Sequence, residues 1–155
     1  MSPSFRTVTT NTESQRAEIA AFVRAVLCTA MAITPRAHHM SFPIADLDRS
    51  RAFYEGVLGF EEIPRPDFPF RGAWYRAGDC EVHLIEVPDG ADVGSTPAGT
   101  NPIARHAAFA VDDYAACAEH LRAHGLEVLE TSAEVGQMWV RDPDGHVLEF
   151  IVPAP

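Results

Sequence analysis

The sequence predicts an α+β fold built from two copies of a βαβββ module, with an extra helix at the N-terminus. The first observation is a pattern that occurs twice: His-x-x-Phe-x-Ile/Val-x-Asp begins at His39 and again, 67 residues later, at His106. The second is that each copy continues into a helical segment and then into three short strand-like segments separated by glycine and proline. A duplicated module of this kind predicts a cup-shaped mixed sheet with helices on one face.

The composition is that of one ordinary globular domain. A chain of 155 residues with 46% hydrophobic residues can bury a substantial core. The formal net charge of −10 argues against binding to nucleic acid or to an anionic membrane, because few cations would face the phosphates. The three cysteines have no CxxC spacing, which favours reduced thiols and a cytoplasmic location. No segment is long and apolar enough to predict a transmembrane helix.

Residues 1–35 are predicted to be an N-terminal extension, and residues 36–155 the domain. Apolar residues at helical spacing predict an amphipathic helix over 13–31, which Pro35 would end. We expect this helix to pack on the domain or on a partner subunit. The alternative is a segment that is dispensable in the cell.

The first module is predicted over about residues 36–88. Its first strand, 37–45, places His39 and Ser41 on one face and apolar residues on the other. Asp46 or Asp48 would cap the following helix. The later elements are a helix over 49–58 and strands over 60–65, 73–77 and 81–87.

The second module is predicted over about residues 104–152, after a linker rich in glycine and proline. Asp112 or Asp113 would start its helix, and the segment Asp142-Pro143-Asp144-Gly145 is a strong turn signal. Its elements are a strand over 104–111, a helix ending at His124, and strands over 126–130, 135–141 and 146–152.

Four residues at equivalent places in the two modules predict a metal site. His39, His83, His106 and Glu149 lie on the first and last strands of each module, on the face opposite the helix-packing residues. Any one of them alone would be read as a structural residue. Three imidazoles and a carboxylate suit Fe, Ni, Co, Zn or Mn better than Ca or Mg, which prefer oxygen ligands.

Other residues are weaker candidates. His120 and His124 have the helical i, i+4 spacing of some zinc ligands but lack the HExxH glutamate, so a solvated helix face explains them better. We expect His146 at the surface. Candidate substrate-binding residues are Ser41, Trp74, Arg76, Met138 and Trp139. Strand parity does not say which strand face meets the cavity, so core packing explains these residues equally well.

Two segments resemble the vicinal oxygen chelate superfamily, which includes glyoxalase I, methylmalonyl-CoA epimerase, extradiol dioxygenases and the fosfomycin and bleomycin resistance proteins. The first runs from His39 to Phe60 and ends in Val57-Leu58-Gly59-Phe60. The second is the Asp142 turn followed by Leu148-Glu149-Phe150. The resemblance implies paired modules forming a cup around a divalent metal, with His39, His106 and Glu149 at ligand positions.

The sequence also departs from that family at two positions. His83 falls where glyoxalase I has a glutamate, which leaves Glu149 as the one carboxylate for proton transfer. Pro43 stands where glyoxalase I usually has a glutathione-binding arginine. Both differences argue against true glyoxalase I activity.

The resemblance therefore implies a metal-dependent lyase or isomerase acting on a small substrate bound through two oxygens. Glu149 would be a ligand and the proton shuttle. The alternatives are an Fe(II) extradiol-type dioxygenase and a non-catalytic small-molecule binding or resistance protein. We expect a homodimer, in which the ligands come from one chain or are shared by two.

Overall fold

The computed structural model describes residues 12–29 and 35–153 and divides the chain into two units. The first unit, up to Arg36, contains helix α1 (Glu13–Thr29), on which Ile19 and Phe22 are exposed. The predicted helix is therefore present as far as Thr29, and residues 1–11 and 30–34 of the predicted extension lie outside the described residues. No helix in the described part of the chain is long and apolar enough to cross a membrane.

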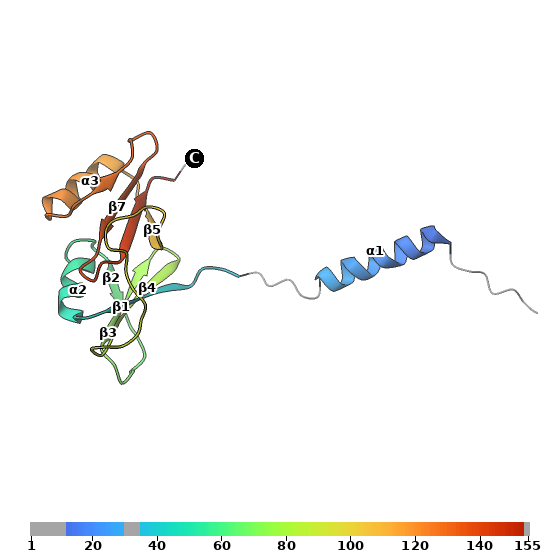
Figure 1. Cartoon of the computed structure of the whole chain (residues 1–155), viewed down its shortest axis with the longest axis horizontal. Helices are drawn as coiled ribbons and strands as arrows, with labels where there is room; N and C mark the ends of the chain where they lie inside the picture. The colour runs from blue at the N-terminus through green and yellow to red at the C-terminus, as the bar shows by residue number, and fades with distance from the viewer. Residues whose placement is uncertain (1–11, 30–34, 154–155) are drawn as a thin grey trace, which may run out of the picture. The chain divides into compact units, whose positions relative to one another are not determined.

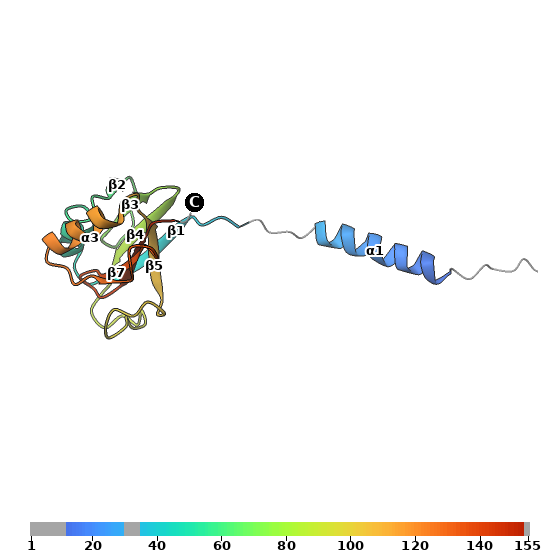
Figure 2. The same cartoon turned by 90° about the horizontal axis from the view of Figure 1, so that it is seen from above.

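The second unit contains both predicted modules, and each forms its own four-stranded sheet (Figures 1 and 2). The first module comprises β1 (His39–Ile44), α2 (Leu47–Tyr54), β2 (Glu61–Ile63), β3 (Gly72–Ala77) and β4 (Cys80–Glu86). The second comprises β5 (His106–Ala110), α3 (Tyr114–Ala123), β6 (Leu129–Glu130), β7 (Gln137–Arg141) and β8 (Val147–Ile151).

The two sheets have the same topology. Their strand orders are β1-β4-β3-β2 and β5-β8-β7-β6. In each sheet the first and last strands of the module pair in parallel, and the other neighbours are antiparallel. The α+β prediction with two βαβββ modules is confirmed, with element ends that differ from the predicted ones by a few residues.

The acidic residue of each repeated motif caps a helix. The side chain of Asp46 accepts the backbone N–H of Arg49, and that of Asp113 accepts the N–H of Ala116, each at 2.9 Å. Each bond satisfies an N–H group that has no partner within its helix. Both carboxylates are therefore used locally and are not metal ligands.

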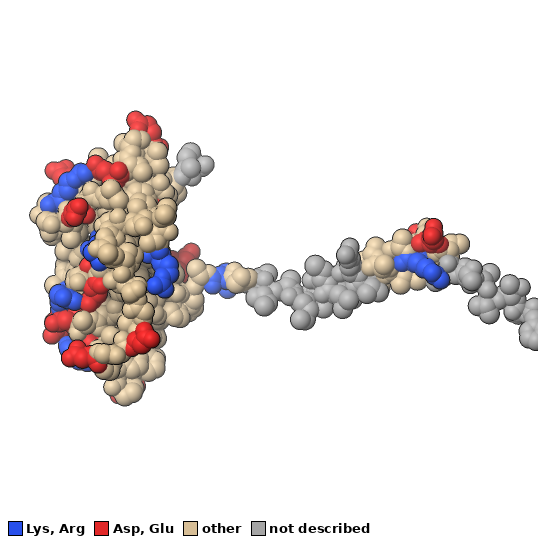
Figure 3. Space-filling model, viewed as in Figure 1, with Lys and Arg blue, Asp and Glu red and all other residues tan. Residues whose placement is uncertain are grey.

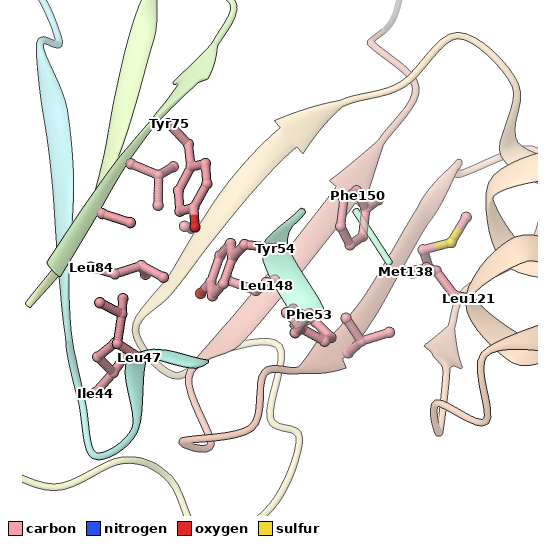
Figure 4. Packing of buried hydrophobic residues seen from close by; sticks show 14 of the residues in the cluster. Ile44, Leu47, Phe53, Tyr54, Tyr75, Leu84, Leu121, Met138, Leu148 and Phe150 are labelled. Carbon is pink, nitrogen blue, oxygen red and sulfur yellow. The ribbon is translucent and has the colours of Figure 1, made fainter. Parts of the chain in front are cut away.

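The apolar faces of both sheets contribute to a single hydrophobic core. Tyr54 of α2 lies between Leu84 of the first sheet and Leu148 of the second, and Phe53 belongs to the same core (Figure 4). On the far side, Leu121 of α3 covers the second sheet. Each such fully buried apolar side chain contributes roughly 1.5–3 kcal/mol. Because the core uses one face of each sheet, the four predicted metal ligands lie on the opposite faces.

The turn between β7 and β8 joins the two modules through a buried carboxylate. Asp142 accepts the hydroxyl of Tyr54 at 2.9 Å, and its other oxygen accepts the N–H groups of Asp144 and His146 at 3.0 and 2.7 Å. Burial raises the pKa of Asp142, since a charged carboxylate loses hydration there. These three donors supply the hydrogen bonds that water would otherwise provide.

The tip of the same turn docks on the start of α2. Asp144 accepts the N–H of Ala45 at 2.9 Å, the guanidinium of Arg49 at 2.6 Å and the hydroxyl of Ser50 at 3.1 Å. Its side chain is 10% exposed, so these charge-assisted bonds are partly shielded from water. The turn therefore fixes the orientation of the second module against the first.

Two histidines add further bonds between the modules. The prediction of His146 at the surface is wrong: it is half-buried, its Nε2–H donates to the carbonyl of Pro43 at 2.7 Å, and its ring packs on Phe42. The turn that precedes His146 carries it onto β1. On α3, His120 bonds the carbonyl of Val57 at 2.7 Å while remaining exposed.

Charged side chains of both signs are interspersed on the visible face of the domain (Figure 3). Several form ion pairs with a partner in the same module, such as Arg51 with Glu62 and Arg122 with Glu130. Partly exposed pairs of this kind contribute little to stability.

We expect Tyr54→Phe to lower the free energy of unfolding by about 1–3 kcal/mol, because it leaves the buried Asp142 short of one donor. The matched control is Tyr75→Phe, whose hydroxyl donates to the more exposed Glu55 and should cost less. Urea unfolding of both variants measures the difference. Equal losses would contradict a special role for the Asp142 contact.

Candidate metal centre

The structure brings the four predicted ligands together as two separate pairs. His39 and His83 are neighbours on the first sheet, and His106 and Glu149 are neighbours on the second. Among the described residues no group of three or more His, Cys, Asp or Glu side chains could hold one metal ion. The prediction of one cavity lined by all four residues is therefore not met within a single chain.

The pair on the second sheet has the geometry of two ligands of one metal. Nε2 of His106 lies 2.8 Å from Oε2 of Glu149. At metal–ligand distances of about 2.0–2.2 Å, adjacent donors of one metal lie about 3 Å apart. The Glu149 side chain is 6% exposed, whereas His106 remains partly open to solvent.

The hydrogen bonds of His106 determine which of its nitrogens is available. Its Nδ1–H donates to the carbonyl of Ala104 at 2.8 Å. A carboxylate only accepts hydrogen bonds, so Nε2 facing Glu149 either carries a second proton or shares a cation with it. A backbone carbonyl on the other ring nitrogen is the usual arrangement for a metal-bound histidine. The residues present therefore fit a divalent metal.

Gln137 orients the carboxylate of this pair. Its side-chain amide donates to Oε1 of Glu149 at 2.9 Å, which leaves Oε2 directed at His106. Gln137 comes from β7 and Glu149 from β8, so the antiparallel pairing of these strands sets the contact.

The pair on the first sheet has a different geometry. The rings of His39 and His83 are stacked, with centroids 4.3 Å apart and planes at 10°. An imidazole binds a metal in its own plane, and two nearly parallel planes do not meet at a shared ion. His39 is exposed, and its Nδ1 lies 2.9 Å from Nδ1 of the exposed His38. Binding of both rings to one metal therefore requires His39 to turn.

His83 is held on its other sides. Trp74 stacks on its second face at 3.9 Å and 3°, and its Nε2 lies 2.9 Å from Oε2 of Glu81. The row of rings continues from Trp74 to Phe68, which stacks on Phe70. His83 is thus held on several sides, whereas its neighbour His39 is exposed.

The candidate substrate-binding residues have different surroundings. Trp74 and Arg76 lie on the same sheet face as His83. Ser41 lines a cavity of about 660 Å³ with Arg105 and His106. The linker between the modules also lines this cavity.

Two of the candidates come from β7. Trp139 is buried opposite Glu149, and its indole Nε1 has no hydrogen-bond partner among the described residues. The prediction of Met138 as a pocket residue is wrong. It occupies the opposite face of β7 and is fully buried in the core beside Phe150.

Sequence reasoning missed Glu81 and Gln137 as members of this site. Each lies two residues from a named candidate, His83 or Trp139, and therefore on the same strand face. This two-residue spacing was the signal from which their place on the site face could have been predicted. Nothing in the pattern alone distinguishes these polar side chains from solvated ones.

We expect Glu81→Gln to destabilise the metal-free protein in a pH-dependent way. The hydrogen bond from His83 lowers the pKa of Glu81 below its ordinary 4.5. A lowered folded-state pKa adds stability above pH 4.5 that is lost as the pH falls through the lower value. Urea unfolding from about pH 7 to 3 should show the variant's deficit shrinking. A deficit that stays constant with pH would contradict this.

Comparison with known proteins places the chain in a family. Residues 36–150 match the model of the Glyoxalase/Bleomycin resistance protein/Dioxygenase superfamily. The chain is 32% identical to a lactoylglutathione lyase of Haemophilus influenzae over 123 residues, covering 73% of this chain and 89% of that one. A glyoxalase family protein of Bacillus anthracis superposes with a TM-score of 0.64 at 26% identity, covering 80% and 99% of the two chains.

A more distant structure in the same comparison contains a metal. It is a point mutant of the fosfomycin resistance protein FosX of Listeria monocytogenes, complexed with Mn(II). It shares 18% identity and the fold at a TM-score of 0.60, covering 79% of this chain and 95% of that one. From the family match, the relative and the shared fold together, this chain belongs to the Glyoxalase/Bleomycin resistance protein/Dioxygenase superfamily.

Proposed function

We propose that this chain is a divalent-metal-dependent, glyoxalase-like enzyme of the lyase or isomerase type. Its substrate would be a small oxygenated molecule that binds the metal through two oxygens. The observation that carries the proposal is the contact of His106 Nε2 with Glu149 Oε2 at 2.8 Å, with Nδ1 of His106 already bonded to Ala104. The similarity to a lactoylglutathione lyase supports the lyase or isomerase class.

We further propose that two chains share each metal site. One chain would supply His39 and His83, and its partner His106 and Glu149. The ligand strands β1 and β5 are edge strands of their sheets, and the exposed side chains of Ala108 and Ala110 lie on the same face of β5 as His106. An exposed edge strand with small apolar side chains favours contact with another chain. This supports a homodimer of the symmetric kind.

The chain's own residues have distinct roles in this proposal. A bound divalent metal would act as a Lewis acid on the substrate oxygens. Glu149 would bind the metal and move the substrate proton, with Gln137 holding its second oxygen in place. Trp74 would form an apolar wall, and the exposed guanidinium of Arg76 is available to an anionic substrate group.

One alternative is retained because of the ligand types. His39, His106 and Glu149 would make the two-histidine, one-carboxylate set of non-haem iron oxygenases. Metal analysis separates the two functions. Iron with oxygen consumption on catechols would support the dioxygenase, and nickel, cobalt, zinc or manganese without it would support the lyase or isomerase.

We expect His106→Ala and Glu149→Ala each to weaken metal binding by at least about tenfold, because each removes a ligand. His124→Ala is the matched control, since the side chain of this exposed histidine hydrogen-bonds to the carbonyl of His120 within α3 and the turn after it. Isothermal titration with Ni²⁺ or Zn²⁺ measures the affinities. Full retention of affinity in both variants would leave a non-catalytic binding protein as the better explanation.

Mixing two inactive variants tests whether the site is shared. His39→Ala and Glu149→Ala would each be inactive alone, but their heterodimer would contain one intact site. After subunit exchange we expect about one quarter of the wild-type activity. An absence of recovery, with heterodimers demonstrated by native mass spectrometry, would indicate that each site is built within one chain.

A further inference from the structure

Residues that the strand register aligns across a sheet form a row. The two modules have similar rows but differ in which row contains a carboxylate. In the first row, the strand register aligns His39, Glu81 and Arg76 in the first module. The corresponding row in the second module is His106, Val147 and Arg141. The histidine and the arginine are repeated, but only the first module has a carboxylate in this row.

The second row shows the reverse arrangement. It contains Ser41, His83 and Trp74 in the first module. In the second module it contains Ala108, Glu149 and Trp139. The tryptophan is repeated, while His83 stands where the other module has its carboxylate. The first module has its carboxylate in the adjacent row instead, at Glu81.

The carboxylate of Glu81 contacts the imidazole of His83. Oε2 of Glu81 lies 2.9 Å from Nε2 of His83, and its other oxygen is 3.7 Å from the guanidinium of Arg76. The side chains of Glu81 and His83 are 18% and 8% exposed, so the contact is shielded from water. Because a carboxylate only accepts, the imidazole proton lies on Nε2.

From this contact we propose that Glu81 is the positioning residue of the first half-site, the pair of His39 and His83 on the first sheet. It keeps the proton of His83 on Nε2 and so presents Nδ1 to the metal. This inference rests on the proposed metal-dependent function. In the other half-site, the carbonyl of Ala104 binds Nδ1 of His106 and leaves Nε2 available, so the two histidines use opposite nitrogens.

The surroundings of His83 support a fixed ring orientation. Trp74 and His39 cover its two faces, at 3.9 and 4.3 Å between ring centroids. No hydrogen bond of the described residues uses Nδ1 of His83. A ring that is stacked on both faces and bonded through Nε2 has one nitrogen left for a ligand.

The test is the tautomer of His83 in the full-length, metal-free protein labelled with ¹⁵N-histidine. Above about pH 7.5, where a free imidazole is neutral, long-range ¹H–¹⁵N spectra should show the proton on Nε2 in the wild type. His83→Ala assigns the signal. Glu81→Gln should give a mixture of tautomers, because an amide can both donate and accept. A proton on Nδ1 in the wild type, or an unchanged spectrum in the variant, would overturn the proposal.

The matched control is Glu61→Gln, which removes a charge from β2 directly across from Arg76. It should leave the tautomer of His83 unchanged. In a titration with Zn²⁺, Glu81→Gln should weaken binding by about 10–100-fold and Glu61→Gln should not. Equal affinities of wild type and Glu81→Gln would overturn this inference alone. A wild type that binds no metal would instead overturn the proposed function.

Discussion

The buried carboxylate of Asp142 is the contact on which the arrangement of the two modules depends. It accepts the hydroxyl of Tyr54 from the first module and two N–H groups of its own turn. The neighbouring Asp144 extends the contact to the start of α2. The apolar faces of both sheets share one core beside this turn, and the opposite faces carry the candidate ligands.

In the two half-sites, different groups orient the histidine side chain. His106 is oriented by a backbone carbonyl, which cannot ionise, and by the contact with Glu149. His83 is oriented by a side-chain carboxylate and by stacking on Trp74. A duplicated module can thus keep its ligand positions while the supporting groups diverge. Where the second module has Glu149, the first has His83, and Glu81 in the adjacent row provides an acidic group on the same sheet face.

Sequence patterns predicted most features that depend on interactions between residues close in the sequence, such as strand faces, helix caps and turns. Strand parity separated His39 and His106 from the core, the two aspartates of the motif are caps, and the Asp142–Gly145 turn closes as expected. The pairing of the ligands could not be predicted in this way. It depends on which strands become neighbours in each sheet, β1 with β4 and β5 with β8, and these strands are distant in the sequence. Met138 was misplaced because a tryptophan and a methionine on adjacent positions of β7 do not reveal which strand face is buried.

The inter-module contact also has a consequence for the order of folding during synthesis. All strands of the first module precede residue 87, whereas part of the surroundings of its helix, namely Leu148 of β8 and the turn at Asp142, is synthesised later. Until those residues leave the ribosome, Tyr54 can contact Phe42 and Tyr75 of its own module, but the side of α2 that meets the second module is uncovered. A nascent first module therefore exposes the kind of surface that chaperones bind, and the chain becomes stable only when the strands at its C-terminal end are available.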